Sequence, residues 1–267
     1  MPLTFGKAPL VEIVAELRWI PPQLAASPQT PLASIPLIGD TKQEEFLMGV
    51  FGEFRSLGFN KPERLVPPGF VTMLYQPVFR FSKVPGPSPI LYQVGAGIFS
   101  THGLPPYKSW DFFAPEVERG IGALLKAGEV NEQTFDFSRV SLRYIDAFNK
   151  ELTGGRDELG FIKDVLRIAI ELPANIVNLV EPGTVPKLSM QFALPVGEGL
   201  MMSLNLAEGD VNNAPAIIVD TTVWQDKRIP GDAKQVMNVL NAAHHIIHKT
   251  FLELTKPIYD LMQPQEA

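Results

Sequence analysis

Two segments of the chain alternate between apolar and polar side chains. In residues 9–19, PLVEIVAELRW, every second position from Val11 to Trp19 is apolar, and in residues 137–148, FSRVSLRYIDAF, the same holds from Val140 to Tyr144. A period of two places the apolar side chains on one face of a β-strand and the polar side chains on the other. We therefore predict two half-buried strands, each with one polar face.

The polar faces of these two strands carry charges of opposite sign. Glu12 and Glu16 share a face of the first strand, and Arg139 and Arg143 share a face of the second. If the strands are neighbours, these groups form either a cross-strand ladder of ion pairs or the wall of a binding site. The ladder is the favoured interpretation, and Glu12, Glu16 and Arg143 are kept as candidates for ligand or partner binding.

The rest of the chain mixes helical and strand-like patterns. Helical spacing predicts helices over 41–58, 109–128, 157–172 and from Gly231 onward. Further strands are predicted over 71–84, 89–102, 187–197, 199–209 and 215–225. The first two of these are expected to form a hairpin across PGPSP, and the Pro-rich residues 20–40 a long irregular loop. Strands in runs between single helices predict an α+β fold with mainly antiparallel sheet packed against helices.

The C-terminal segment has the pattern of one long amphipathic helix. Apolar side chains recur at alternating spacings of four and three residues up to Leu261, and His244 is the polar member of this stripe. Pro257 lacks an amide donor and clashes with the preceding turn, so we expect the helix to kink or end near Lys256. The remainder of the stripe should stay packed on the sheet.

Three of the four histidines, His244, His245 and His248, lie in this helix. The spacing of His244 and His248 matches that of the zinc motif H-E-x-x-H, but His245 stands where the catalytic glutamate belongs. One interpretation is therefore a metal site at His244 and His248. The favoured one is a buried His244 hydrogen-bonded into the sheet, with His245 facing solvent, and His244 is kept as a binding candidate without a metal.

The segment GLPPYKSW combines two prolines with the aromatic residues Tyr107 and Trp110 before a predicted helix. Such a turn either fixes how the chain enters the helix or presents aromatic side chains to a ligand or peptide. Tyr107 and Trp110 therefore join the binding candidates.

Composition excludes several classes of protein. The 267 residues contain no cysteine, so a disulfide or a Cys-type zinc site is excluded. The net charge is −6 with no run of Lys or Arg, which makes nucleic-acid binding an unfavoured function. No apolar run approaches the roughly 20 residues of a membrane span, and Glu12 and Glu16 interrupt any N-terminal signal. We expect a cytoplasmic protein with no membrane partner.

No enzyme signature is present in the chain. A nucleophile elbow, a Walker loop and a dinucleotide fingerprint are all missing, since GAG at Gly95–Gly97 lacks the required spacing. We therefore expect no cofactor and no assigned catalytic residue. Residues 1–267 are interpreted as one domain, with two halves, 1–149 and 150–267, as a pseudo-duplicated alternative.

Four stretches, PLVEIVAELRW, GLPPYKSWDFFAPEVE, RVSLRYIDAFN and AHHIIHKTF, together resemble a sporadically distributed family of bacterial proteins of unknown function and about this length. The resemblance covers nearly the whole chain. The matching positions are Glu12, Glu16, Leu17, Arg18, Pro106, Tyr107, Trp110, Phe113, Arg143, Tyr144, His244 and Phe251. The chain departs at His102, where the family frequently has Asn. The resemblance implies a one-piece cytoplasmic bacterial protein and fits a role in defence or toxin neutralisation.

The function expected from these observations is noncatalytic binding through a protein partner or a second copy of the chain. Two alternatives stay open. One is a small apolar ligand held in a helix-grip-like cavity between the sheet and the last helix. The other is a metal-dependent hydrolase that uses His244 and His248.

Overall fold

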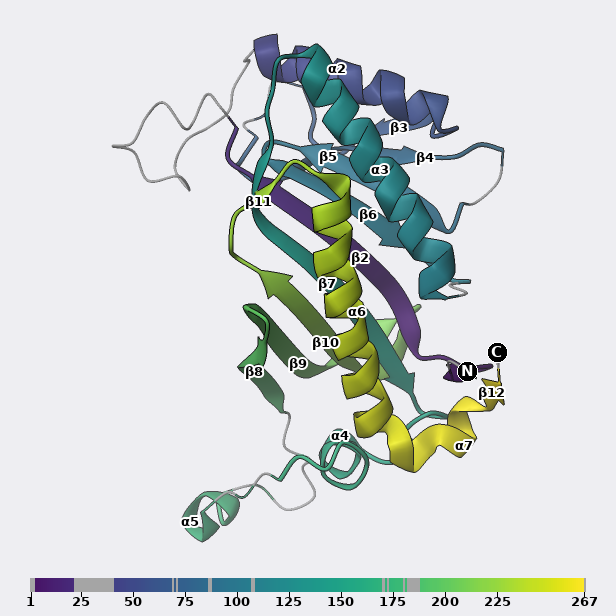
Figure 1. The fold of residues 1–267 in the computed structure, drawn as a ribbon. Coiled ribbons are helices and arrows are strands. Elements are labelled where there is room, and N and C mark those ends of the chain that lie inside the picture. Colours follow the sequence, from purple (N-terminus) through teal and green to yellow (C-terminus); the bar gives the residue numbers. More distant parts are fainter. Residues whose placement is uncertain are drawn as a thin grey trace.

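A computed structural model of the chain contains one antiparallel sheet of ten strands (Figure 1). The structure describes residues 3–21, 41–68, 70, 72–85, 88–106, 109–169, 171, 173–179, 181 and 188–266. The loop predicted for residues 20–40 lies almost wholly outside these residues, as does Tyr107. The predicted α+β class, with mainly antiparallel sheet and a long C-terminal helix, is confirmed.

The sheet has two strands from distant parts of the chain at its centre. Across the sheet the strands are β3 (Lys61–Arg64), β4 (Pro77–Ser82), β5 (Ile90–Gly95), β6 (Ile98–Gly103), β2 (Leu10–Trp19), β7 (Asp136–Asn149), β10 (Ala214–Gln225), β9 (Leu200–Val211) and β8 (Ser189–Gly197). The short strand β11 (Ile229–Pro230) also pairs with β7. A separate pair, β1 (Leu3–Phe5) and β12 (Pro264–Glu266), joins the two ends of the chain.

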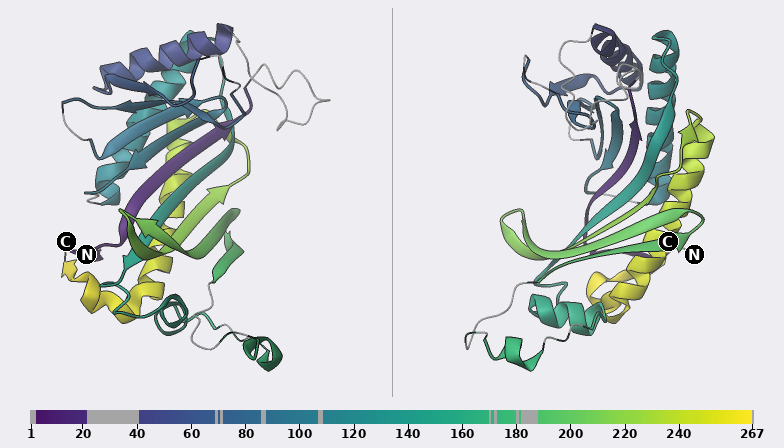
Figure 2. Two further views of the ribbon diagram at one scale, coloured as in Figure 1. Left: turned by 180° about the vertical axis from the view of Figure 1, so that it is seen from behind. Right: turned by 90° about the vertical axis from the view of Figure 1, so that its left-hand side faces the viewer.

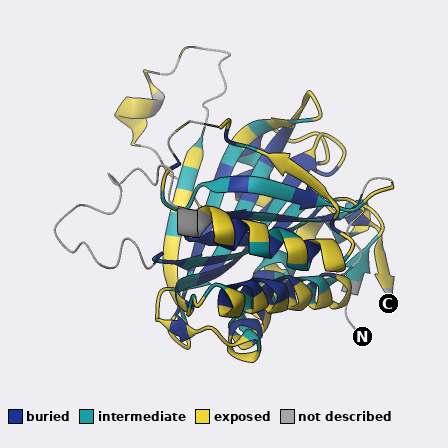
Figure 3. Cartoon of the chain, turned by 90° about the horizontal axis from the view of Figure 1, so that it is seen from above, coloured by how far each residue is buried: buried dark blue, intermediate teal, exposed yellow. Residues whose placement is uncertain are grey.

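Three long helices pack on the same face of this sheet. They are α2 (Thr41–Ser56), α3 (Trp110–Val130) and α6 (Ala233–Thr255). The sheet bends away from α3 and α6, so the opposite face is concave, and no described helix lies on it (Figures 1 and 2). We call this surface the open face. Seen from above, the helices are exposed on their outer sides and buried toward the sheet (Figure 3).

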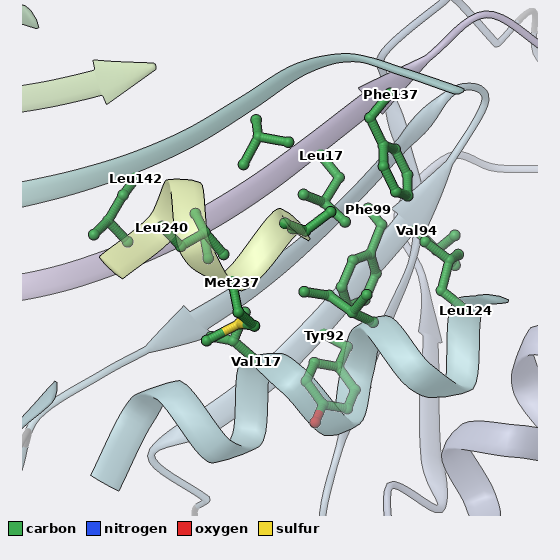
Figure 4. Close-up of a cluster of buried hydrophobic side chains, with 14 of the residues drawn as sticks. Leu17, Tyr92, Val94, Phe99, Val117, Leu124, Phe137, Leu142, Met237 and Leu240 are labelled. Carbon is green, nitrogen blue, oxygen red and sulfur yellow. The ribbon is translucent and has the colours of Figure 1, made fainter. Parts of the chain in front are cut away.

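The alternation that predicts the strands also builds the core. Ile13, Ala15, Leu17 and Trp19 of β2 are all buried on the helix side, as the pattern requires. Leu17 pairs with Phe99 across β2 and β6, and both lie beneath α3 and α6 in the cluster of Figure 4. A second hydrophobic cluster lies under the end of α6, where Pro257 ends the helix at Thr255 as predicted.

The predicted hairpin over 71–102 is wrong in its second arm. The sequence predicts one strand over residues 89–102, but these residues contain β5 and β6, joined at Ala96 and Gly97. Gly97 has a φ of +71°, which glycine adopts without steric cost, so a tight turn fits inside a nearly continuous apolar run. β3 was also not predicted, because all four of its residues are exposed and follow no apolar pattern.

The helix predicted over 157–172 is also wrong in length. Its start forms α4 (Glu158–Gly160) and one π-helical turn, η2 (Phe161–Val165), whose apolar side chains are buried. Arg167 then adopts a φ of +57°, which ends the helical path. The described chain continues through α5 (Ala174–Val177). Near the C-terminus, η3 (Lys256–Ile258) and α7 (Tyr259–Met262) follow α6.

The three predicted strands of the last third are confirmed as β8, β9 and β10. Asn212 and Asn213 form the two-residue turn between β9 and β10, with φ values of +53° and +61° that asparagine tolerates. The strands before and after residue 149 belong to the same sheet. The division into two duplicated halves stays a prediction.

Two glycines of α3 test how tightly this helix packs on the sheet. A Cβ on Gly120 would lie 2.8 Å from Phe99 Cζ and 2.9 Å from Tyr92 Cε1, whereas one on Gly122 meets nothing within 4 Å. We expect Gly120→Ala to lower the free energy of unfolding by about 1–2 kcal/mol because overpacking outweighs the helix propensity of alanine. Gly122→Ala should raise it by about 0.5–1 kcal/mol. Urea unfolding measures both, and equal effects would contradict this packing.

Candidate functional site

The polar faces of β2 and β7 lie side by side on the open face. Their antiparallel register pairs Val14 with Arg143, Glu16 with Ser141 and Arg18 with Arg139. The two strands are therefore neighbours. This is the arrangement that we expect to bring the carboxylates of β2 near the guanidiniums of β7. Glu12, Glu16 and Arg143 come together on this face.

The ion pairs differ from the expected ladder between β2 and β7. Arg143 donates two hydrogen bonds to Asp220 of β10, from Nε at 2.9 Å and from Nη2 at 2.7 Å. Glu16 accepts at 2.6 Å from Arg18 of its own strand. Each guanidinium therefore has a carboxylate partner, but the partner of Arg143 comes from a third strand.

A groove of about 400 Å³ runs over β2, β7, β10, β9 and β8. Its lining residues are Val14, Glu16, Arg18, Arg139, Ser141, Arg143, Gln191, Ala193, Ser203, Asp220, Thr222 and Trp224. At one end, Arg139 stacks over the Trp224 ring at 5.4 Å from its centroid, and both side chains hydrogen-bond Asp226. The groove is polar, with three guanidiniums held in place by neighbouring carboxylates.

These pairs keep the charges of the open face fixed. The hydrogen bonds to Asp220 raise the pKa of Arg143, although burial opposes this. A hydrogen bond from His102 holds the pKa of Glu12 below its ordinary value, against the effect of burial. Burial alone would raise the pKa of Asp226, but the hydrogen bonds from Arg139 and Trp224 lower it. The hydrogen bonds thus stabilise the charged forms of Arg143, Glu12 and Asp226.

Glu12, His102 and Ser100 form a hydrogen-bonded chain on the same face. His102 Nδ1 lies 2.7 Å from Glu12 Oε1, and His102 Nε2 lies 2.9 Å from Ser100 Oγ. This order of groups is that of a carboxylate, histidine and hydroxyl triad. Ser100 is only 2% exposed, however, so its hydroxyl is not accessible to a substrate. The chain therefore orients Glu12 rather than forming a nucleophile in this conformation.

Trp110 and His244 lie on the opposite side of the sheet from Glu12, Glu16 and Arg143. Tyr144 Oη and His244 Nδ1 form a hydrogen bond of 2.8 Å, and the His244 ring stacks on Trp110 with a centroid distance of 4.6 Å and an angle of 6°. Trp110 in turn donates to Asn241 at 2.9 Å. Burial and the neighbouring histidines lower the pKa of His244 to about 4, so its ring is neutral at pH 7.

The histidine cluster thus joins α3, α6 and β7. His245 is exposed, in agreement with the prediction, and the rings of His244 and His248 are 5.7 Å apart. Within the described part of the chain, no group of three or more His, Asp or Glu side chains is placed to hold a metal ion. The contacts of His244 are those of a side chain that links secondary-structure elements.

Comparisons of the chain with family models, with curated proteins and with solved structures returned no match. The resemblance to the sporadically distributed bacterial family therefore stays a prediction. Among the described residues, no helix is both long and apolar enough to cross a membrane.

Sequence reasoning missed the contribution of β10 to the groove. Asp220, Thr222 and Trp224 occupy every second position of residues 215–225 and share the open face with Arg143. The alternation of these residues indicates that they share one face of a strand. The sequence does not show that this strand, β10, lies directly beside β7, so it does not place them next to Arg143.

Asp146 is a second titratable group that the sequence did not single out. It lies on β7 and is 4% exposed. Burial, together with the negative charge of Asp220, raises the pKa of Asp146 to about 7. The folded protein therefore binds a proton here between about pH 4 and pH 7, where the unfolded chain does not.

The stability that Asp146 contributes is present below about pH 4 and is lost as the pH rises through 7. We expect the free energy of unfolding of Asp146→Asn, relative to that of the wild type, to rise by about 2–4 kcal/mol as the pH rises from 4.5 to 8. His244 has the opposite pH dependence, because the stability that it contributes is lost as the pH falls from about 6.5 through 4. This dependence should be visible in the variant, where the contribution of Asp146 is removed.

Urea unfolding across this pH range measures both effects. The matched control is Asp136→Asn, a change at the exposed start of the same strand, where we expect little effect. An identical pH dependence for Asp146→Asn and the wild type would rule out the perturbed carboxyl.

Proposed function

We propose that the protein is a noncatalytic binding protein that docks a protein partner on the open face of its sheet. The observation that carries this proposal is the groove itself, a polar surface with fixed charges on a sheet whose other face is covered by α2, α3 and α6. An open concave face of this kind is a surface that a partner can cover without any rearrangement of the core.

The groove residues have the chemistry of an interface. Arg and Trp are enriched among the residues that contribute most to protein–protein affinity, and Arg139, Arg143 and Trp224 all line the groove. The Arg143 side chain is 47% exposed yet bound at two points to Asp220. A side chain that is oriented before binding loses less conformational entropy when the partner arrives.

The charge pattern favours a polypeptide with charges of both signs. Three guanidiniums and the carboxylates of Glu16 and Asp220 line the groove, so the lining is close to electrically balanced. A polyanion such as nucleic acid requires an excess of cations. An apolar ligand would leave these charges buried without compensation. A mixed-charge protein segment satisfies both signs.

The two alternative functions have less support. Large side chains, including Tyr92, Phe99 and Leu240, occupy the space between the sheet and the helices where an apolar ligand would lie (Figure 4). The Nδ1 atom of His244 is already bonded to Tyr144. A cytoplasmic location, and a role in bacterial defence or toxin neutralisation, remain expectations of the family resemblance.

The test is capture of a partner from the native cell, followed by affinity measurements with the purified pair. We expect Arg143→Ala and Trp224→Ala each to weaken binding at least about tenfold. The exchange Arg143→Asp with Asp220→Arg keeps an ion pair between β7 and β10 but moves the guanidinium, so it should weaken binding similarly while the protein stays folded.

The matched control is Arg119→Ala, an exposed arginine of α3 on the opposite side of the sheet, for which we expect less than about a twofold change. A partner that binds all groove variants as tightly as the wild type would contradict the proposal. So would a retained apolar ligand in native mass spectrometry, stoichiometric zinc, or self-association as the sole interaction.

A further inference from the structure

Two arginines of the groove lie directly opposite each other on neighbouring strands. The register of β2 and β7 pairs Arg18 with Arg139, and both side chains line the groove. Directly opposed residues of an antiparallel pair have Cβ atoms only about 4.5–5.5 Å apart, and like charges in such a pair repel each other. The exposed fraction of the side chain is 33% for Arg18 and 36% for Arg139. A ligand in the groove therefore reaches two neighbouring guanidiniums.

Each of these guanidiniums is held in position by a carboxylate and an aromatic ring. Arg18 donates from Nε to Glu16 at 2.6 Å, and its guanidinium lies 5.2 Å from the centroid of the Tyr75 ring. The surroundings of Arg139 are equivalent, because Nε donates to Asp226 at 2.6 Å and a tryptophan ring lies under the guanidinium. Both side chains are thus oriented before a ligand arrives, which lowers the entropic cost of binding.

The Nη groups of both side chains remain available to a ligand. A guanidinium carries N–H donors on its two Nη atoms as well as on Nε. Among the described residues, no acceptor is hydrogen-bonded to an Nη atom of Arg18 or Arg139. None of these Nη atoms belongs to the buried side-chain atoms that lack a partner, so they keep accessible surface. What these oriented donors lack is an acceptor.

The charges around the pair favour a carboxylate as this acceptor. The positive charges of Arg18 and Arg139 are matched by the neighbouring Glu16 and Asp226. Burial alone would raise the pKa of Asp226, but hydrogen bonding and the charges of Arg139 and Arg18 lower it, so both arginines act on the same region. A carboxylate adds a single negative charge to this balanced group, whereas a phosphate group carries about −1.5 to −2 at pH 7. Glu16 and Asp226 therefore repel phosphate more strongly.

We propose that the partner docked on the open face places an acidic side chain between Arg18 and Arg139, with its carboxylate accepting hydrogen bonds from the Nη atoms of both. The inference rests on the proposed function and names the chemistry by which the partner is recognised. Hydrogen bonds between a guanidinium and a carboxylate are roughly twice as strong as those between neutral groups. Arg143 is less suited to this role, because it already donates two hydrogen bonds to Asp220.

Two capped tripeptides test the inference on the full-length protein, acetyl-Ala-Glu-Ala-amide and its neutral counterpart acetyl-Ala-Gln-Ala-amide. NMR titrations that follow the arginine Nε–H signals give the affinity of each peptide. We expect the acidic peptide to bind with a Kd of roughly 10 mM or below, and the neutral peptide to bind at least about tenfold more weakly. Inorganic phosphate is the third probe, and we expect it to bind more weakly than the acidic peptide.

The central variants are Arg18→Gln and Arg139→Gln, because glutamine removes the charge and keeps a polar side chain. We expect each to weaken binding of the acidic peptide at least about fivefold. The matched control is Arg228→Gln, since Arg228 is 77% exposed, pairs with Asp136 and does not line the groove. We expect this control to change the affinity less than about twofold. Should one groove variant fail to fold, the other decides, and the comparison of the two peptides needs neither.

Four results would overturn the inference. They are the absence of binding by the acidic peptide at roughly 100 mM, about tenfold above the weakest Kd expected, equal affinity of the two peptides, tighter binding of phosphate, and an effect of Arg228→Gln as large as that of the groove variants.

The captured partner separates this inference from the proposed function. A partner whose binding is weakened by Arg143→Ala but not by Arg18→Gln or Arg139→Gln would contradict the inference and leave the proposed function standing. Binding of the acidic peptide through Arg18 and Arg139, with a partner that ignores every groove variant, would contradict the proposed function and leave the carboxylate site.

Discussion

The pairing of β2 with β7 at the centre of the sheet is the constraint on which the rest of the structure depends. Its register pairs Ile13 with Tyr144 on the helix side and Glu16 with Ser141 on the open side. A slip of one residue would exchange the two faces of a strand, moving charges into the core and apolar side chains to solvent. Both the packing of α3 and α6 and the charge pattern of the groove follow from this one register.

The open face can carry many charges because each is compensated close to where it lies. Arg143 is held by Asp220 on the next strand, and Arg139 by Asp226 and the Trp224 ring. Such half-exposed pairs add little to the stability of the fold. Their effect is orientation, since a guanidinium bound at two points has few rotamers left. Glu158 differs because it is buried and its Oε1 atom has no hydrogen-bond partner among the described residues, where the cost of desolvation is largest.

A strand can be predicted from the sequence where its apolar–polar pattern does not run on into the next strand. In residues 9–19 the alternation ends at Trp19, where β2 ends, and in residues 137–148 it holds from Val140 to Tyr144 inside β7, so the sequence predicts both strands. In residues 89–102 the apolar run continues through the turn at Gly97, so the sequence pattern predicts one strand where the structure has two. The candidates Glu12, Glu16 and Arg143 could be found because side chains of one strand share a face. Asp220 could not, since its pairing with Arg143 depends on the strand order, which local patterns do not encode.

The separation of the candidate residues between the two faces decides how they should be interpreted. Trp110 was a candidate for an exposed aromatic surface, but one ring face stacks on His244 and its indole nitrogen donates to Asn241. His244, in turn, is bonded to Tyr144 and neutral at pH 7 because burial lowers its pKa to about 4. These contacts within the fold leave Trp110 and His244 with less capacity for a ligand. Arg143 and Trp224 keep solvent-facing surface in the groove, so recognition is expected on the open face.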